Sequence, residues 1–127
     1  IHGGAGVIDR ASLSPAREAE FRGALARIAG DAWHALMHGA SALDVVEQAV
    51  CDLEDFPLFN AGHGAVLNAE GLAEMDAAIM DGHARRAGAV AGVLSPKHPV
   101  SLARAVMEQS EHVFLVGPEA DRFAQLC

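Results

Sequence analysis

The stretch Leu53-Glu54-Asp55-Phe56-Pro57-Leu58-Phe59-Asn60-Ala61-Gly62-His63-Gly64 is apolar, yet its glycines and asparagine are typical of a loop. Ordinary loops are polar and exposed, so we expect this one to be buried and held in one conformation. A buried loop must satisfy its own backbone carbonyl groups. Wrapping those carbonyls around a cation is one way to do so, and the segment is therefore predicted to support a site rather than to be the site itself.

The chain around this loop is unusually apolar for its size. Of its 127 residues, 51% are hydrophobic but only 5% are aromatic, and the mean hydropathy is +0.20. A domain of this length buries about two-thirds of its unfolded surface, so much apolar surface would remain exposed if it folded alone. The chain starts at Ile1 without a methionine and stops at Cys127 after a helical pattern. We expect residues 1–127 to be a single partial domain completed by a second chain.

Charge and cysteine content argue against several classes of protein. A net charge of −8 and a pI near 5.2 disfavour nucleic-acid binding, which requires a basic surface. No apolar run approaches the roughly 20 residues of a membrane-spanning helix. Two cysteines, Cys51 and Cys127, do not make a disulfide framework. The sequence therefore predicts a protein of the reducing cytoplasm.

The apolar periodicity predicts a mixed α+β fold. Ser14-Pro15 and Ser41 resemble helix starts, and Asp81-Gly82 predicts the turn of a hairpin. Helices are expected at residues 14–38, 41–53, 99–110 and 117–126, and strands at 74–80, 87–94 and 113–116. The inward helical positions are expected to be Phe21, Leu25, Ile28, Ala32 and Leu36, then Leu43, Val46, Val50 and Leu53, then Leu102, Ala103 and Val106. We expect antiparallel pairing, a strand 87–94 covered on both faces, and helices as the covering layers.

The segment His2-Gly3-Gly4-Ala5-Gly6 follows an expected strand end at Ile1 and offers unhindered backbone N–H groups. Such groups can bind an anion or an oxyanion, although a tight turn through glycines with positive φ explains the same residues. No Gly-Lys-Ser/Thr follows, so the segment is not a P-loop. No serine lies within Gly-x-Ser-x-Gly, which argues against an α/β-hydrolase.

The other candidate groups have structural explanations. His34 and His38 are one helical turn apart, a spacing that can bind zinc, but the glutamate of His-Glu-x-x-His is missing. Asp76 is either an anchor of its strand or a site residue, because a carboxylate on a buried strand must be paired. Acidic neighbours are expected to raise the pKa of Cys51, which disfavours a nucleophile. The remaining histidines, His63, His83, His98 and His112, show no mutual spacing.

Six segments together resemble the α subunit of the plant-type asparaginases and isoaspartyl peptidases, which are N-terminal-nucleophile hydrolases. Each segment alone is a weak signal, but their order and spacing are specific and cover almost the whole chain. The segments are Ile-His-Gly-Gly-Ala-Gly at 1–6, Ser-Ala-Leu-Asp-Val-Val-Glu at 41–47, the loop at 53–64, Glu-Met-Asp-Ala-Ala-Ile-Met-Asp-Gly at 74–82, Ala-Gly-Ala-Val-Ala-Gly-Val at 87–93 and Val-Met-Glu-Gln-Ser at 106–110.

This resemblance implies a precursor that cleaves itself into α and β subunits, folds as an αββα four-layer sandwich and assembles as (αβ)2. The present chain would supply about half of the sandwich. The family nucleophile is the threonine at the new N-terminus of β, activated by its own α-amine. Residues 1–127 contain no threonine, so the nucleophile must lie on another chain. The implied reaction is hydrolysis of L-asparagine or of β-aspartyl dipeptides through an acyl-enzyme, with no cofactor for the chemistry.

The resemblance also assigns supporting roles to residues of this chain. Asn60 corresponds to the asparagine close to the nucleophilic threonine, and Gly3 and Gly4 to a glycine loop whose strain assists autocleavage. The apolar loop corresponds to the sodium-binding loop of the family, and an alkali cation prefers hard oxygen ligands. The implied ligands of the structural Na⁺ are the backbone carbonyls of Leu53, Glu54, Phe56, Phe59, Ala61 and His63.

Two alternatives remain open at this point. The glycosylasparaginase and threonine-aspartase branches share the same layout, and their substrate specificity is set on the β subunit. A non-catalytic scaffolding or ion-binding fragment would also retain these motifs. The polar linker that precedes the family's cleavage point is absent from this chain, and residues 14–38 match only in their amphipathic pattern.

Overall fold

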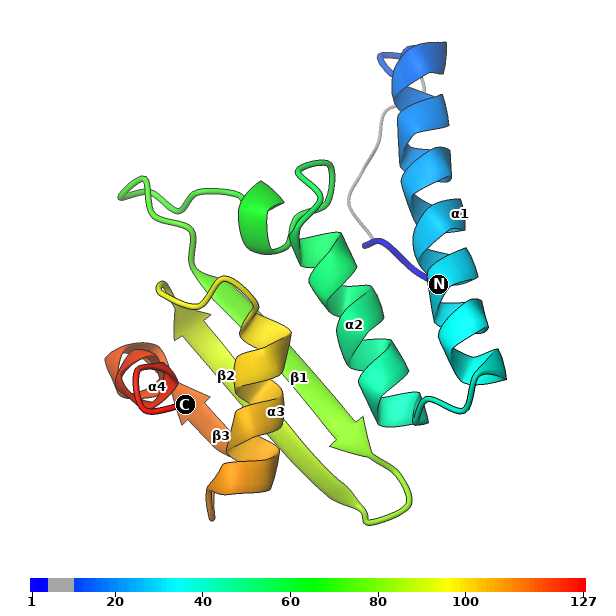
Figure 1. Cartoon of the computed structure of the whole chain (residues 1–127). Helices are drawn as coiled ribbons and strands as arrows, with labels where there is room; N and C mark the ends of the chain where they lie inside the picture. The colour runs from blue at the N-terminus through cyan, green and yellow to red at the C-terminus, as the bar shows by residue number, and fades with distance from the viewer. Residues whose placement is uncertain (5–10) are drawn as a thin grey trace.

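The computed structural model describes residues 1–4 and 11–127, and within them four α-helices and a three-stranded sheet form an α+β fold (Figure 1). The elements are α1 (Pro15–Met37), α2 (Ala42–Glu54), the 3-10 helix η1 (Gly62–Gly64), β1 (Met75–Asp81), β2 (Arg86–Val93), α3 (Pro99–Gln109), β3 (Phe114–Val116) and α4 (Gly117–Ala124). The predicted α+β class and every predicted helix and strand in this part of the chain, except the strand end at Ile1, are confirmed.

The helix starts follow from local capping chemistry. Ser14 Oγ accepts a hydrogen bond from Arg17 N at 3.2 Å, and Pro15 occupies the first helical position of α1. At α2, Ser41 Oγ accepts from Asp44 N at 3.1 Å and donates to the carboxylate of Asp44 at 2.7 Å. Because these caps involve residues three apart, they could be predicted from the sequence alone.

The sheet has the order β1-β2-β3 and mixes the two kinds of pairing. β1 and β2 form the predicted antiparallel hairpin, with Asp81 opposite Arg86 at its closed end. β3 pairs with β2 in parallel, so the expectation of purely antiparallel pairing is wrong for this strand. The reason is the connection: α3 lies between β2 and β3, and a helical crossover returns the chain in the same direction.

One face of the sheet packs against α3 and forms the main core. Val90, Val93 and Val106 are fully buried there, as predicted for Val106. Gly88 lets the two layers approach closely, because a Cβ atom at this position would lie 2.7 Å from Met107 N. The buried members of this core are Ile79, Val90, Val93, Val100, Leu102, Ala103, Val106, Met107 and Ala120.

The opposite face of the sheet is apolar but uncovered among the described residues. Met80 is 62% exposed and Phe114 is 55% exposed, and Val116 is similarly open. The prediction that both faces are covered is therefore wrong for this chain as it stands, and only Leu115 of β3 turns toward the core. In Figure 1, α2 and α3 lie on the same side of the sheet.

A second, smaller core joins α1 to α2 and to the apolar loop. Its buried members are Ala24, Ile28, Leu53 and Phe59. The predicted inward positions Leu36 and Val46 are exposed, and Ala24 and Val45 are buried in place of such residues. The apolar positions show which side of each helix can be buried. Among the described residues, however, nothing covers Leu36 of α1 or Val46 of α2.

Candidate functional site

A pocket of about 1000 Å³ lies between the N-terminal segment, α1, the end of α2 and the apolar loop. It brings together Gly3, Gly4 and Asn60, the three residues that the sequence proposed as supporting groups for catalysis. These residues are separated by more than fifty positions in the chain, so only the packing of α1 against α2 unites them. The charged residues at its edge, Glu18 and Arg22, form an ion pair at 2.8 Å.

The described residues 1–4 of the N-terminal segment have no regular secondary structure. The expected end of a strand at Ile1 is wrong, since residues 1–4 carry no strand pairing. Gly4 has φ of +115°, and its N–H donates to His2 Nδ1 at 3.0 Å. A Cβ at Gly3 would lie 2.5 Å from Phe59 Cε1, so glycine is required there by packing. Ala5 and Gly6 of the same motif lie outside the described residues.

Asn60 is fixed in the pocket wall by one hydrogen bond. Its Oδ1 accepts from Val66 N at 2.9 Å, so the side-chain amide holds the loop to the segment that follows. No hydrogen bond among the described residues uses the NH2 group of Asn60, which leaves two donors for a ligand or a partner chain. This position is compatible with a supporting role next to a reacting group supplied from outside residues 1–127.

The apolar loop is buried only in part: Leu53, Glu54 and Phe59 are buried, whereas Pro57, Asn60 and His63 are exposed, so the prediction of a buried loop holds for its anchoring residues alone. Phe59 is buried and meets Phe21 edge to face at a centroid distance of 5.8 Å, with Phe56 beside it at 5.9 Å. Gly62 has φ of +50°, and a Cβ there would collide with the backbone of Glu54. Phe59 thus anchors the loop to α1, and the glycine allows the chain to fold back over the end of α2.

Backbone carbonyls gather around η1 in a way that suits a cation. A Cβ at Gly64 would collide with the carbonyl oxygen of Phe59 and lie 2.8 Å from that of Pro57, while Gly62 lies against the carbonyl of Glu54. The carbonyls of Leu53, Phe56, Phe59 and Ala61 each accept one hydrogen bond within the loop. A carbonyl oxygen has two lone pairs, so these groups can still bind an ion. The donor set therefore fits a hard alkali cation.

The side chain of Glu54 has a separate role that the sequence did not reveal. It is only 3% exposed, and its Oε1 accepts from Val100 N at 3.1 Å, which caps the start of α3. Its Oε2 lies 3.2 Å from Nδ1 of His98. Burial raises the pKa of the Glu54 carboxyl, while the hydrogen bonds from Val100 and His98 oppose that rise. The cap crosses 46 positions of sequence, which no local pattern indicates.

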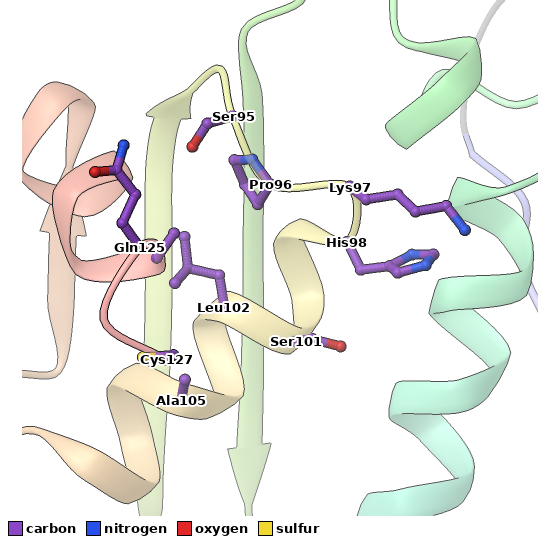
Figure 2. A pocket seen from close by; sticks show the side chains of 10 residues that line it. Ser95, Pro96, Lys97, His98, Ser101, Leu102, Ala105, Gln125 and Cys127 are labelled. Atoms are coloured by element: carbon purple, nitrogen blue, oxygen red, sulfur yellow. The ribbon is translucent and has the colours of Figure 1, made fainter.

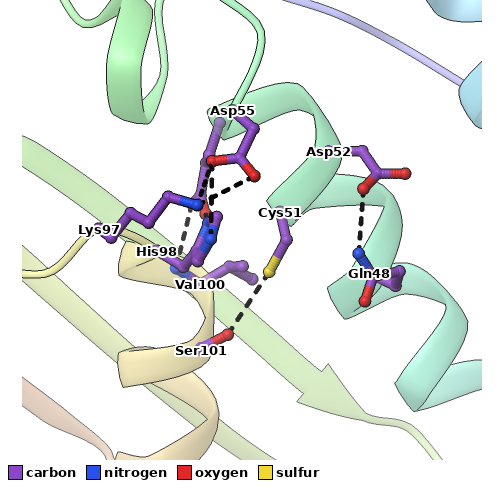
Figure 3. A network of polar contacts seen from close by, with 9 residues as sticks. Gln48, Cys51, Asp52, Asp55, Lys97, His98, Val100 and Ser101 are labelled. Carbon is purple, nitrogen blue, oxygen red and sulfur yellow. Dashed lines mark hydrogen bonds and ion pairs between the residues drawn. The ribbon is translucent and has the colours of Figure 1, made fainter.

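Cys51 lies at the same junction of α2 and α3 (Figure 3). Its Sγ is 3.5 Å from Ser101 Oγ, and its ligand atom and those of Glu54 and His98 lie within 4.8 Å of one another. Burial raises the pKa of the Cys51 thiol, and the nearby carboxylates of Glu54 and Glu47 add to the effect. The predicted direction is confirmed. His98, which shows no spacing to the other histidines in the sequence, contacts the Glu54 carboxylate in the structure.

The remaining candidates have the structural roles that the sequence considered. His34 and His38 stack at 4.1 Å, and Nδ1 of His38 contacts the backbone carbonyl of His34 at 2.8 Å. Asp76 is exposed and accepts from Gly92 N at 2.8 Å across an irregularity in the hairpin register. Asp81 accepts from His83 N in the turn. Asp76 and Asp81 are therefore anchors of the hairpin.

A smaller pocket of about 410 Å³ lies between α3 and α4 (Figure 2). Its wall is mainly apolar and includes Leu102 and Ala105 from α3 and Cys127 from the end of the chain. His98 and Ser101 also line it, so solvent can approach the α2–α3 junction from this side. None of the residues assigned by the resemblance lies here.

Comparisons with known proteins agree over the full length of the chain. The sequence model of the asparaginase family matches residues 1–127. The chain is 52% identical over 124 residues to the isoaspartyl peptidase of Salmonella typhimurium, covering 98% of this chain and 40% of that protein. It is 51% identical over 126 residues to the plant-type L-asparaginase of Thermococcus kodakarensis, covering 99% and 40%. The isoaspartyl peptidase/L-asparaginase of Rattus norvegicus is 47% identical over 124 residues, covering 98% and 36%. The chain thus spans about two fifths of the length of the curated relatives it matches.

Proposed function

The chain belongs to the asparaginase family, and from this membership we propose that it is the α subunit of an autoprocessed amidohydrolase. The proposed reactions are hydrolysis of L-asparagine to L-aspartate and ammonia and hydrolysis of β-aspartyl dipeptides. The observation that carries the proposal is the match of the whole chain to relatives named for both activities, at 47% to 52% identity. Residues 1–127 contain no threonine, so the proposed threonine nucleophile lies outside them.

The uncovered face of the sheet supports the proposed partner. Met80, Phe114 and Val116 present apolar side chains there, beside the small residues Ala89 and Ala91 of β2. Small residues on one sheet allow a second sheet to pack closely, about 10 Å away. A β subunit that places its own sheet on this face would complete the proposed αββα sandwich, and two such pairs would form (αβ)2.

The residues of this chain would support the chemistry rather than perform it. In the proposed reaction, the threonine hydroxyl of the partner attacks the amide carbonyl, ammonia or an amino acid leaves, and water releases L-aspartate from the acyl-enzyme. Asn60 would orient groups near the nucleophile through its free amide donors. Gly3 and Gly4 would shape the backbone beside it, and the packing of Gly3 on Phe59 would hold that backbone in place.

The proposed structural cation would stabilise the loop that carries Asn60. Na⁺ would balance the partial negative charge of the carbonyl oxygens that bind it and would take no part in the proposed chemistry. The proposed ligands are the carbonyls of Leu53, Glu54, Phe56, Phe59, Ala61 and His63. No helix in the described part of the chain is long and apolar enough to cross a membrane. On a separate ground, the free cysteines Cys51 and Cys127, we propose a cytoplasmic location.

The proposal is tested with the native preparation, including every polypeptide that copurifies. Intact-mass analysis should find a second polypeptide that begins with threonine. Kinetics on L-asparagine, β-aspartyl-leucine and a glycosylated asparagine then identify the branch, with turnover expected on the first two. Turnover of the glycosylated substrate alone would favour the glycosylasparaginase branch. Hydrolysis by residues 1–127 without any partner would contradict the proposed division of labour.

Asn60→Ala tests the role of the pocket. Loss of an orienting donor should lower kcat by at least about tenfold, whereas loss of the hydrogen bond from Val66 N should lower the stability by only about 1 kcal/mol. Asn68→Ala is the control, because Asn68 fixes a neighbouring turn through Leu72 N and Glu70 N and is absent from the pocket lining. Equal activity of the two variants would remove Asn60 from the proposed mechanism.

A further inference from the structure

The junction of α2 and α3 holds a cluster of metal-binding side chains that the proposed reaction does not use. Cys51 and Glu54 come from the last turns of α2, and His98 comes from the residue that precedes α3. Glu54 is almost fully buried, and Cys51 and His98 are partly buried. We propose that these three side chains form a binding site for a divalent transition-metal ion such as Zn²⁺.

The observed distances are close to those that a tetrahedral ion requires. With Zn–N and Zn–O bonds of about 2.0–2.2 Å, the nitrogen and oxygen of two ligands are about 3.3 Å apart. Glu54 Oε2 and His98 Nδ1 are 3.2 Å apart in the structure. The three ligand atoms lie within 4.8 Å of one another, so the Cys51 sulfur needs to move by at most about 1 Å to reach its expected separation. The fourth position is left for a solvent molecule.

The binding mode keeps the existing cap of α3. The ion takes the place of the contact between Glu54 Oε2 and His98 Nδ1, whereas Glu54 Oε1 continues to accept from Val100 N. A carboxylate that binds a metal is usually held by a hydrogen bond as well, and here the second oxygen of Glu54 would keep that bond. The ion would therefore add a link between α2 and α3 without removing the hydrogen bond that starts α3.

Asp55 is placed to orient the histidine. Its Oδ1 lies 3.7 Å from Nε2 of His98, and Lys97 Nζ holds the same carboxylate at 2.9 Å (Figure 3). A histidine that binds a metal through one ring nitrogen usually donates from the other to a carboxylate. The arrangement matches this pattern after a small rotation of the ring.

The donor types select the metal. A thiolate and an imidazole favour Zn²⁺ or Co²⁺ over Mg²⁺ and Ca²⁺, which prefer oxygen ligands. One thiolate and one carboxylate neutralise the two charges of the ion, and a neutral set is suited to a partly buried site. The side chains of this site are distinct from the backbone carbonyls proposed to bind Na⁺, although Glu54 contributes to both.

Metal titration of the native preparation, with copurifying polypeptides retained, tests the site. We expect one Zn²⁺ per chain, a rise in Tm with Zn²⁺, and a sulfur-to-cobalt charge-transfer band when Co²⁺ is used as the probe. Cys51→Ala and His98→Gln should each weaken Zn²⁺ binding by more than about tenfold. The matched controls Cys127→Ala and His38→Gln should bind as the unchanged protein does, because both residues are exposed.

Three results would overturn the proposal. The first is no Zn²⁺ binding by the unchanged protein. The second is equal binding by Cys51→Ala and Cys127→Ala. The third is a loss of binding in His38→Gln, which would place the ion at the exposed His34–His38 pair. If Cys51→Ala does not fold, the cobalt spectrum of Cys127→Ala decides the question, since a retained thiolate band supports Cys51 and its absence excludes it. These readouts do not depend on amidase activity.

Discussion

The two faces of the sheet differ in surroundings much more than in composition. The face toward α3 buries Ile79, Val90 and Val93, and burying one such side chain contributes about 1.5–3 kcal/mol. The other face carries Met80 and Phe114, both more than half exposed. Alternation along each strand separates the two sets. The described residues therefore complete the core on the α3 side of the sheet and leave the apolar layer on the other side exposed.

Two substitutions at adjacent positions of β2, one on each face of the sheet, should have the largest effects on folding and on partner binding. Val90→Asp places a charge in the core and should cost more than about 4 kcal/mol, so no folded chain should be recovered. Ala89→Asp, one residue earlier on the opposite face, should leave the chain folded but release the proposed β subunit. Yield, circular dichroism and size-exclusion chromatography of the native preparation measure both. A folded Val90→Asp variant would show that the face toward α3 is not a tightly packed core.

Gly88→Ala tests how tightly α3 covers the inner face. The added Cβ would collide with the backbone of Ala103 and Met107, and the required shift should cost about 1–3 kcal/mol. Gly82→Ala is the control, since a Cβ in the hairpin turn meets no atom of the described residues within 4 Å. Thermal unfolding compares the two variants. Similar Tm values would mean that α3 can move away from β2 at little cost.

Asp121 of α4 binds the segment that follows β2 through hydrogen bonds. The contribution of this contact to the stability of the α3-side core should depend on pH. Burial would raise the pKa of its carboxyl, but hydrogen bonds from Ser95 and from Leu94 N outweigh that effect and lower it. A carboxyl with a lowered folded-state pKa contributes stability above its unfolded value of about 3.9 and loses it as the pH falls further. Asp121→Asn should lose about 1 kcal/mol at neutral pH and show a smaller acid-side decline between about pH 4 and pH 2.

Urea unfolding at a series of pH values measures this difference. Glu119→Gln is a suitable control because Glu119 pairs only with Arg122 on the exposed side of α4. Parallel acid-side slopes for Asp121→Asn and the unchanged protein would contradict the assigned cause of the lowered pKa.

The smallest effect is expected at Met80. Its side chain is 62% exposed on the outer face, so Met80→Ser should change the folding free energy of the chain itself by less than about 0.5 kcal/mol. Denaturant unfolding of the chain separated from its partner measures this if the separated chain stays folded; otherwise the recovered amount of folded complex is compared. A loss above about 2 kcal/mol for the chain itself would show that this face is covered within the chain.

The sequence predicted the positions of the helices and strands more reliably than it predicted which of their faces are buried. Ser14 and Pro15 act within one helical turn, and Asp81 acts within one hairpin, so their roles are visible in a short window of sequence. Leu36 and Val46 were expected to be buried and are exposed, because apolar periodicity identifies a face but not what covers it. The parallel pairing of β3 was missed since it depends on where α3 packs.

The candidate site likewise contains residues that the sequence pointed to and residues that only the structure brought together. The roles of Gly3, Gly4 and Asn60 came from a resemblance, and the structure adds that they share one pocket. The sodium ligands remain a prediction, supported by the carbonyls gathered around η1. The cluster of Cys51, Glu54 and His98 was not predicted, because His98 lies 44 positions from Glu54 and shows no motif spacing to it.

The sequence by itself determined the order of the helices and strands and the family, because capping, alternation and residue identity are local properties. Only the tertiary structure decided which apolar face is buried and that Glu54 caps α3 beside Cys51 and His98. These contacts depend on how α2, α3 and the sheet pack, and packing joins residues whose separation along the chain carries no signal.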